Sequence, residues 1–277
     1  MAERPVDELD EQVLFRIDGG VAWIVLNRPD AANAITAGQR DRVIDHLARA
    51  SGDLAVRVVV LTSQGKGFCT GADLRASRAG QTRPEGAPER PAGSVARLIA
   101  SGAQRLIAAV LDCEKPIIAA VGGTAAGLGA HLAFACDLVI ASEDASFIEV
   151  FVRRGIVADG GGAWLLPRLV GIQKAKELLF FGDKVTANDA LGLGLVNRVV
   201  PAGELEAEAR RWAERLANGP TVAIGLTKRL VNRSLDADRA TAFHEEAMAQ
   251  EIAMQSADAQ EGVQAFVERR DPTYHGW

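Results

Sequence analysis

The chain has 277 residues, of which 48% are hydrophobic and 24% are charged, and its formal net charge is −5. This length suits one large domain or a domain with a helical appendage. The net charge is negative, whereas nucleic-acid-binding domains carry an excess of Lys and Arg, so we expect no nucleic-acid partner.

The cysteines and the N-terminal residues indicate a cytoplasmic protein. Cys69, Cys113 and Cys136 form no CxxC pair, and we expect reduced thiols that are buried as small hydrophobic side chains. The first residues, MAERPVDELDEQ, are acidic and lack the apolar core of a signal peptide.

Short β-type runs alternate with helical stretches along residues 1–200. The β-type runs cover 21–27, 56–63, 116–122, 137–142 and 195–200, and the helical stretches cover 37–50, 94–111 and 173–181. This alternation indicates an α/β protein with a mostly parallel sheet. No fixed period repeats in the sequence.

Residues 116–136 form an uncharged stretch that is long enough to span a bilayer, and it contains a GxxxG pattern from Gly123 to Gly127. However, several glycines interrupt it, and a short β-type run precedes them. A buried strand, a glycine turn and a buried small-residue helix explain the same residues. We therefore expect no membrane span.

Two further segments define the domain organisation. Residues 77–93 are rich in Gly, Pro, Arg and Glu, and they form either a mobile surface loop or a lid. Residues 201–277 are predicted to be a helical C-terminal region, with helices over 204–218, 237–255 and 259–269, whose apolar spacing suits packing on the core or on another subunit. The core then comprises residues 1–200.

Two glycine-containing turns follow predicted strands: GKGFCTGADL at 65–74 and GGTAAGLGAHL at 122–132. Neither matches a phosphate-binding glycine motif. If both strand ends face one cleft, backbone N–H groups from each turn could bind one oxygen as an oxyanion hole. Each turn alone could equally be a tight connection.

An ordered set of motifs resembles the enoyl-CoA hydratase/isomerase (crotonase) superfamily. The motifs are WIVLNRPDAANAIT (23–36), GFCTGADL (67–74), the stretch 115–147, GIVADGGGAWLLPRLVG (155–171) and AFVERR (265–270). The resemblance implies the crotonase (ClpP-like) fold, a spiral of ββα units with a helical trimerisation region. It also implies an acyl-CoA substrate, a homotrimer or dimer of trimers, no metal and no cofactor beyond the coenzyme A of the thioester. By position, the oxyanion donors would be the N–H groups of Ala72 and Leu128.

The resemblance also locates the acid–base groups. Where hydratases of the family carry two glutamates, this chain has His131 and Phe151, which puts hydration in doubt. Asp159 holds the position of the carboxylate in the isomerase branch, which includes the ring-epoxide isomerase of phenylacetyl-CoA degradation. A single carboxylate can move a proton between two carbons. Apolar neighbours, such as Val157, Trp164 and Phe151, should raise its pKa.

Three residues keep alternative roles. Asp159 could instead cap the helix that begins near Gly161. His131 could be a second acid or base, or a residue of the pocket wall. Glu149 could reach the cleft if its segment is extended, but exposure on the surface is the expected outcome.

Coenzyme A contacts are implied by the resemblance at two stretches of the core and in the C-terminal helices. The residues are Arg28, Ala32, Ala34, Asp73, Leu74 and Arg75, with Lys228 and Phe266 completing the site from this or a neighbouring subunit. The favoured function is enoyl-CoA double-bond or related ring isomerisation. The alternatives are enoyl-CoA hydration and a non-catalytic acyl-CoA-binding protein.

Overall fold

The computed structural model describes residues 8–75, 86, 88 and 91–277. Its larger sheet has six strands, in the spatial order β1 (Val13–Asp18), β2 (Val21–Leu26), β3 (Val58–Ser63), β5 (Ile117–Val121), β7 (Leu138–Ser142) and β10 (Arg198–Val200). All neighbours pair in parallel except β1 and β2. The predicted mostly parallel sheet is confirmed.

A smaller sheet has the order β4 (Gly67–Cys69), β6 (Thr124–Ala126), β8 (Ser146–Ile148) and β9 (Lys184–Thr186). Its first three strands follow β3, β5 and β7 along the chain and pair in parallel in the same succession. Each turn of the chain therefore adds one strand to each sheet before a helix returns it, which is a spiral of ββα units.

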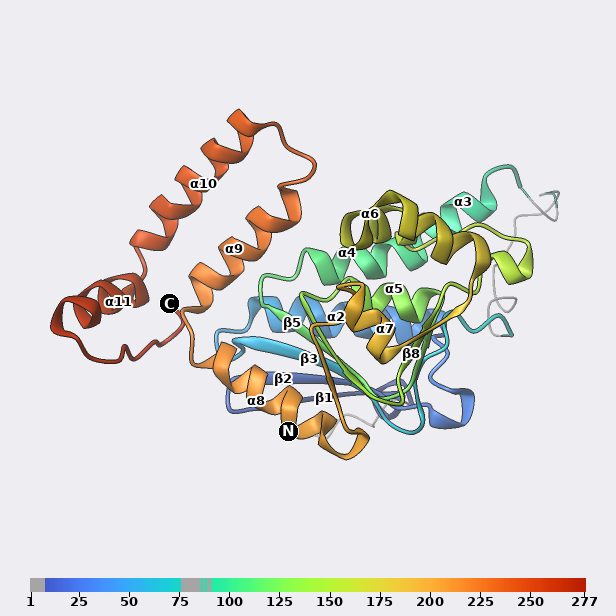
Figure 1. Cartoon of the computed structure of the whole chain (residues 1–277), viewed down its shortest axis with the longest axis horizontal. Coiled ribbons are helices and arrows are strands. Elements are labelled where there is room, and N and C mark those ends of the chain that lie inside the picture. Colours follow the sequence, from blue (N-terminus) through green and yellow to red (C-terminus); the bar gives the residue numbers. More distant parts are fainter. Residues whose placement is uncertain (1–7, 76–85, 87, 89–90) are drawn as a thin grey trace.

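Helices cover both faces of the larger sheet (Figure 1). In the core they are α1 (Glu8–Gln12), α2 (Ala37–Gly52), α3 (Ser94–Ile99), α4 (Arg105–Leu111), α5 (Leu128–Phe134), α6 (Gly162–Phe181), α7 (Ala187–Gly192) and α8 (Leu205–Ala217). A π-helical turn, η3 (Ala100–Gln104), joins α3 to α4, and short 3₁₀ turns lie at Pro29–Ala31, Val152–Arg154 (η4) and Ala202–Glu204.

The central strands β2, β3, β5 and β7 of the larger sheet are apolar because both of their faces are buried. Along β2, alternate residues belong to two different clusters: Ile24 packs with α2, α4 and α5, whereas Trp23 packs with α8. The first cluster is much the larger of the two. The uncharged stretch 116–136 is β5, a turn, β6 and the fully buried α5, so the predicted strand–turn–helix is confirmed.

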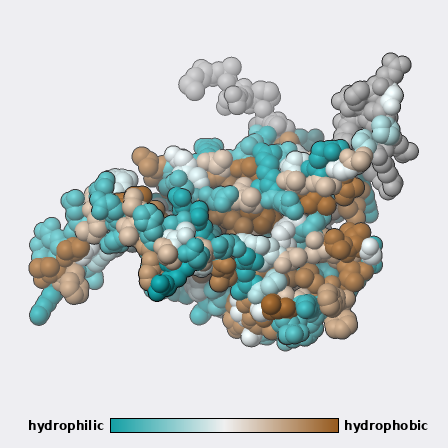
Figure 2. All heavy atoms as spheres, turned by 90° about the horizontal axis from the view of Figure 1, so that it is seen from above, coloured by the Kyte–Doolittle hydropathy of each residue, from teal (hydrophilic) through white to brown (hydrophobic). Residues whose placement is uncertain are grey.

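The C-terminal helices form an arm beyond the core. It contains α9 (Thr221–Arg233), α10 (Arg239–Met254) and α11 (Ala257–Glu268), which project from one end of the molecule (Figures 1 and 2). Helix α8, the first helix of the predicted C-terminal region, packs against the larger sheet through Ala209, Ala213 and Ala217, so this part of the region lies on the core.

One helical stretch, 94–111, is long and apolar enough to cross a membrane by length and composition alone. Its second half is α4, which buries Leu106, Ile107 and Val110 in the core. The three cysteines are buried and unpaired, as expected, and burial raises the pKa of the Cys69 thiol to about 12. The predicted loop at 77–93 lies largely outside the described residues.

Candidate active site

The two glycine turns meet, and two of their N–H groups donate to no acceptor in the part of the chain that the structure describes. The Ile35 N–H donates to the Gly71 carbonyl oxygen, and the Asp73 N–H donates to the Ile35 carbonyl oxygen. Because successive N–H groups of an extended segment point in opposite directions, the N–H of Ala72 points away from Ile35. Leu128 is the first residue of α5, where backbone N–H groups have no acceptor inside the helix. A Cβ added to Gly71 would lie 3.5 Å from the Leu128 nitrogen, so the two segments adjoin.

The glycines of these turns are needed mainly for backbone packing. A Cβ on Gly123 would lie 2.0 Å from the Lys66 carbonyl oxygen, and one on Gly129 would lie 2.0 Å from the Cys69 carbonyl oxygen. Both contacts bring the segment around β6 and α5 against β4. The glycines therefore set the distance between the two predicted oxyanion donors.

Asp159 lies in the loop before α6, beside the Leu128 turn. A Cβ on the next residue, Gly160, would lie 2.8 Å from Leu128 Cδ1, 3.4 Å from Ala103 Cβ and 3.5 Å from His131 Nδ1. The structure thus brings together three of the predicted catalytic residues, Asp159, Leu128 and His131. The π-helical turn that contains Ala103 forms the wall opposite them.

The environment of Asp159 favours the neutral acid. Burial raises the pKa of the Asp159 carboxyl above its usual value, while the charge of His131 lowers it by less. The alternative role as a helix cap is wrong, since the N-cap of α6 is Gly161 and it receives no side-chain bond. Val157 was expected to shield Asp159 from solvent, but this expectation is wrong, because Val157 is itself 85% exposed.

His131 is fully buried on α5 and paired with an acid. Its Nε2 lies 2.9 Å from Glu149 Oε2, and its ring stacks on Phe151 with centroids 5.2 Å apart. The expectation that Glu149 is exposed is wrong, because only 5% of the residue is accessible. Glu149 directly follows β8 (Ser146–Ile148), and the chain turns at Val150 and Phe151, so no regular alternation in the sequence signals its burial.

The predicted coenzyme A residues of the core lie beside Ala72. Arg28 bonds to Asp73 at 2.7 Å and to the Ala34 carbonyl oxygen, and the Arg75 N–H donates to Asp73. Ala32 adopts a left-handed conformation in the same loop, and Leu74 is 59% exposed. The structure gathers these residues at one edge of the site, and their contact with coenzyme A stays a prediction.

The two predicted contacts in the C-terminal helices lie elsewhere. Lys228 is buried, and its ammonium group bonds to Asp137 at 2.9 Å and to the carbonyl oxygens of Val110 and Lys115. All three N–H donors are therefore used inside the chain, which argues against the predicted contact of Lys228 with coenzyme A. Phe266 is 85% exposed on α11, in the arm that projects from the core (Figure 1).

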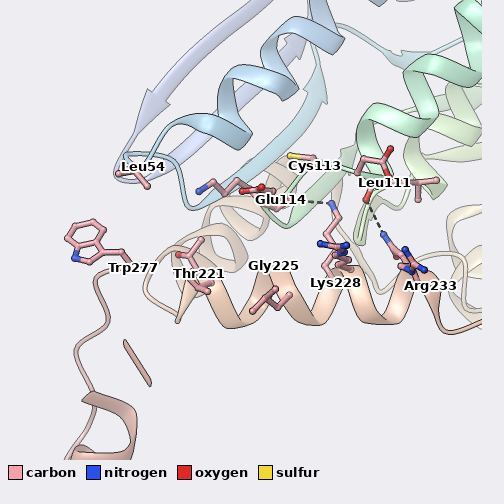
Figure 3. A pocket seen from close by; sticks show the side chains of 16 residues that line it. Leu54, Leu111, Cys113, Glu114, Thr221, Gly225, Lys228, Arg233 and Trp277 are labelled. Atoms are coloured by element: carbon pink, nitrogen blue, oxygen red, sulfur yellow. Dashed lines mark hydrogen bonds between the residues drawn. The ribbon is translucent and has the colours of Figure 1, made fainter. Parts of the chain in front are cut away.

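A cavity of about 690 Å³ lies between α9 and the core, lined by residues that include Leu111, Glu114, Lys228 and Trp277 (Figure 3). The cavity adjoins Leu111 at the C-terminal end of α4, whereas Asp159 lies near the other end of this helix. The volume of a cavity therefore does not identify the site of Asp159. No cluster of His, Cys, Asp and Glu within the described part of the chain could hold a metal ion.

The turns of Ala72 and Leu128 and the half-buried carboxylate of Asp159 thus lie together in one site. Residues 16–276 match the enoyl-CoA hydratase/isomerase family, and the chain belongs to this family. It is 37% identical to a protein of Rhodobacter capsulatus named "Probable enoyl-CoA hydratase", with 95% of this chain and 98% of the relative covered. It is 35% identical to the 1,2-epoxyphenylacetyl-CoA isomerase of Escherichia coli, with 96% and 99% covered.

A solved structure, an enoyl-CoA hydratase/isomerase from Cupriavidus metallidurans, gives a TM-score of 0.86 at 36% identity, covering 96% of this chain and 97% of the other. The crotonase fold is therefore confirmed. The chain is an enzyme of this family, with acyl-CoA chemistry, and the non-catalytic alternative is not retained.

Proposed function

We propose that the protein isomerises an enoyl-CoA thioester, or a related ring substrate, with Asp159 as the single proton carrier. The observation that supports this most directly is the position of Asp159, half buried beside Leu128 and His131. A raised pKa makes an ionised carboxylate a stronger base. Among the described residues, a half-buried acid–base group thus lies beside two N–H donors that have no protein acceptor.

In the proposed reaction, the thioester oxygen of a 3-enoyl-CoA accepts hydrogen bonds from the N–H groups of Ala72 and Leu128. The Asp159 carboxylate removes a proton from C2, and the electron pair of that C–H bond forms the dienolate. Each donor stabilises the developing oxyanion by roughly 3 kcal/mol. The carboxylic acid then returns its proton to C4, which leaves the double bond conjugated with the thioester.

Hydration of a 2-enoyl-CoA is the second candidate, and one observation favours it. The buried pair of His131 and Glu149 supplies ionisable groups beyond Asp159, and hydration requires a group that activates water. Against this, the pair is enclosed, whereas Asp159 is only half buried.

The test offers the purified protein a 3-enoyl-CoA and, separately, a 2-enoyl-CoA, together with the Asp159→Asn variant. We expect conjugation of the 3-enoyl substrate and a loss of at least 100-fold in the variant, in line with the usual contribution of an acid–base group. Asp144→Asn, at an exposed aspartate between β7 and β8, is the matched control. Hydration of the 2-enoyl substrate that survives Asp159→Asn would overturn the proposal.

We also propose a homotrimer, or a dimer of trimers, that assembles in the cytoplasm through the arm. Helix α10 has no buried residue in the single chain. The arm exposes a set of large apolar side chains, Phe243, Met248, Ile252, Met254, Val263, Phe266 and Val267. Such exposure calls for a partner surface, and Phe266 could then reach the coenzyme A of a neighbouring subunit. Light scattering should give three or six times the 29.3 kDa of one chain, and a monomer would refute the assembly.

A further inference from the structure

Two buried polar atoms next to the Asp159 turn have no hydrogen-bond partner within the described chain: Nδ1 of His131 and Oε1 of Glu149. Leaving a buried donor or acceptor unpaired costs about 1–3 kcal/mol. Two such atoms on one interacting pair therefore require a physical reason, and a functional role is one of the recognised reasons.

The His131 ring is held in one orientation from several sides. Nε2 bonds to Glu149, and Phe151 stacks on one face of the ring. Gly162 packs on the edge that carries Nε2, where an added Cβ would lie 2.2 Å away, and Gly160 lies near Nδ1. Nε2 faces Glu149 Oε2, and Nδ1, on the other side of the ring, lies near Gly160 in the turn that carries Asp159.

We propose that Glu149 is a positioning residue for the isomerisation, because it holds His131 so that its ring faces the turn of Asp159 and provides a positive charge there when protonated. This inference rests on the proposed function. Its consequence is that the pKa of the Asp159 carboxyl rises less than burial alone would raise it. Asp159 remains the group that touches the substrate, and Glu149 acts on it only through the ring of His131.

Other charged groups around this cluster have partners elsewhere. Arg105 of α4 bonds to Asp41, and Arg168 of α6 bonds to Asp236. Arg153 of η4 lies 3.9 Å from Asp183, and Arg154 of the same turn is exposed. His131 is the charge that lowers the pKa of the Asp159 carboxyl, against the larger effect of burial.

The test compares Glu149→Gln and His131→Gln with the parent enzyme. Loss of the carboxylate removes the counter-charge of the ring, so less positive charge remains beside Asp159. We expect the acidic limb of the kcat/KM profile for a 3-enoyl-CoA to move up by on the order of half to one pH unit in both variants. The double variant should shift no further than His131→Gln, because both changes act through one ring.

Glu177→Gln is the matched control, since Glu177 is an exposed acid of α6 that pairs with Lys174, and its profile should equal that of the parent. Phe151→Leu disturbs the packing of the same ring without changing charge. It should lower the melting temperature and leave the acidic limb in place. If Glu149→Gln lowers activity equally at all pH values and leaves the acidic limb in place, Glu149 is merely structural and the inference is overturned.

A second readout does not depend on activity. The ¹³Cγ signal of Asp159, assigned by its absence in Asp159→Asn, reports the titration of this carboxyl directly. We expect its midpoint to rise in Glu149→Gln. An unchanged midpoint overturns the role of Glu149, whether or not the isomerase assay succeeds. A raised midpoint in a protein that converts no 3-enoyl-CoA would support the coupling of the three side chains and refute the proposed reaction instead.

Discussion

The two predicted oxyanion donors can be tested at Leu128, because the position of this residue allows its N–H to be removed. Leu128 is the first residue of α5, where a proline fits the helix and its missing N–H breaks no helical bond. The preceding Gly127 has φ 53° and ψ −123°, outside the α region that a following proline disfavours. Leu128→Pro should therefore leave α5 in place.

The expected magnitudes separate two effects. Leu128 is 5% exposed, so loss of its side chain should cost about 2–5 kcal/mol of stability in Leu128→Ala and a comparable amount in Leu128→Pro. Only the proline removes the N–H. Loss of one oxyanion donor lowers kcat by about 100- to 1,000-fold.

The assay follows conjugation of a 3-enoyl-CoA at a temperature at which circular dichroism shows both variants to be folded. Leu128→Ala serves as the matched control, and we expect it to keep kcat within about tenfold of the parent, since its N–H is retained. Equal kcat values for the alanine and proline variants would refute the assignment of this N–H to the oxyanion.

Two further predictions concern the buried charges. Lys228→Met should lower the melting temperature by about 10 °C, because it leaves the partly buried carboxylate of Asp137 without its ammonium partner at a cost of about 3 kcal/mol. KM for the acyl-CoA should stay within about twofold of the parent. Asp159→Asn should be more stable than the parent at neutral pH. Because the folded pKa of Asp159 lies above the ordinary 3.8, the ionised form is disfavoured by folding, and the advantage of the variant should shrink as the pH falls toward 3.8.

Each of these predictions has its own control. For Lys228, the exposed Lys176 of α6 offers Lys176→Met, which should change stability little, and a large rise in KM in Lys228→Met alone would restore this lysine as a coenzyme A ligand. For Asp159, thermal melts between about pH 4 and 8 suffice. A constant stability difference across this range would mean that the pKa of Asp159 is the same in the folded and unfolded chains.

The central strands of the larger sheet were predictable because β2, β3, β5 and β7 are buried on both faces and therefore appear as apolar runs. Strand β1 was not predicted, since it is mostly exposed and contains Arg16 and Asp18. The strands of the smaller sheet were not, since β4, β6, β8 and β9 contain three residues each. A segment of this length shows no periodicity of its own. Helix α9 was also missed, because it begins directly after Pro220 without a side-chain cap.

The candidate site was predicted in part. The resemblance placed Asp159, Leu128 and Ala72, and the structure brings the turns that carry them together. The resemblance could not reveal the ion pair of Lys228, because its partner Asp137 lies in a distant part of the sequence. It also missed the burial of Glu149, because a lone acid in a sequence is most often exposed, and its partner lies eighteen positions away on α5.

The family resemblance implies that two glutamates of the hydratases are replaced in this chain, and the structure shows how the replacing side chains pack. His131 stands at one of these positions and Phe151 at the other, and the two rings stack on each other. Glu149 turns into the space beside them and bonds to the imidazole. A carboxylate is therefore present but enclosed, with no face open to activate a water molecule. The accessible acid is Asp159, and moving a proton between two carbons of a bound dienolate requires one such group and no water. This arrangement therefore favours isomerisation over hydration.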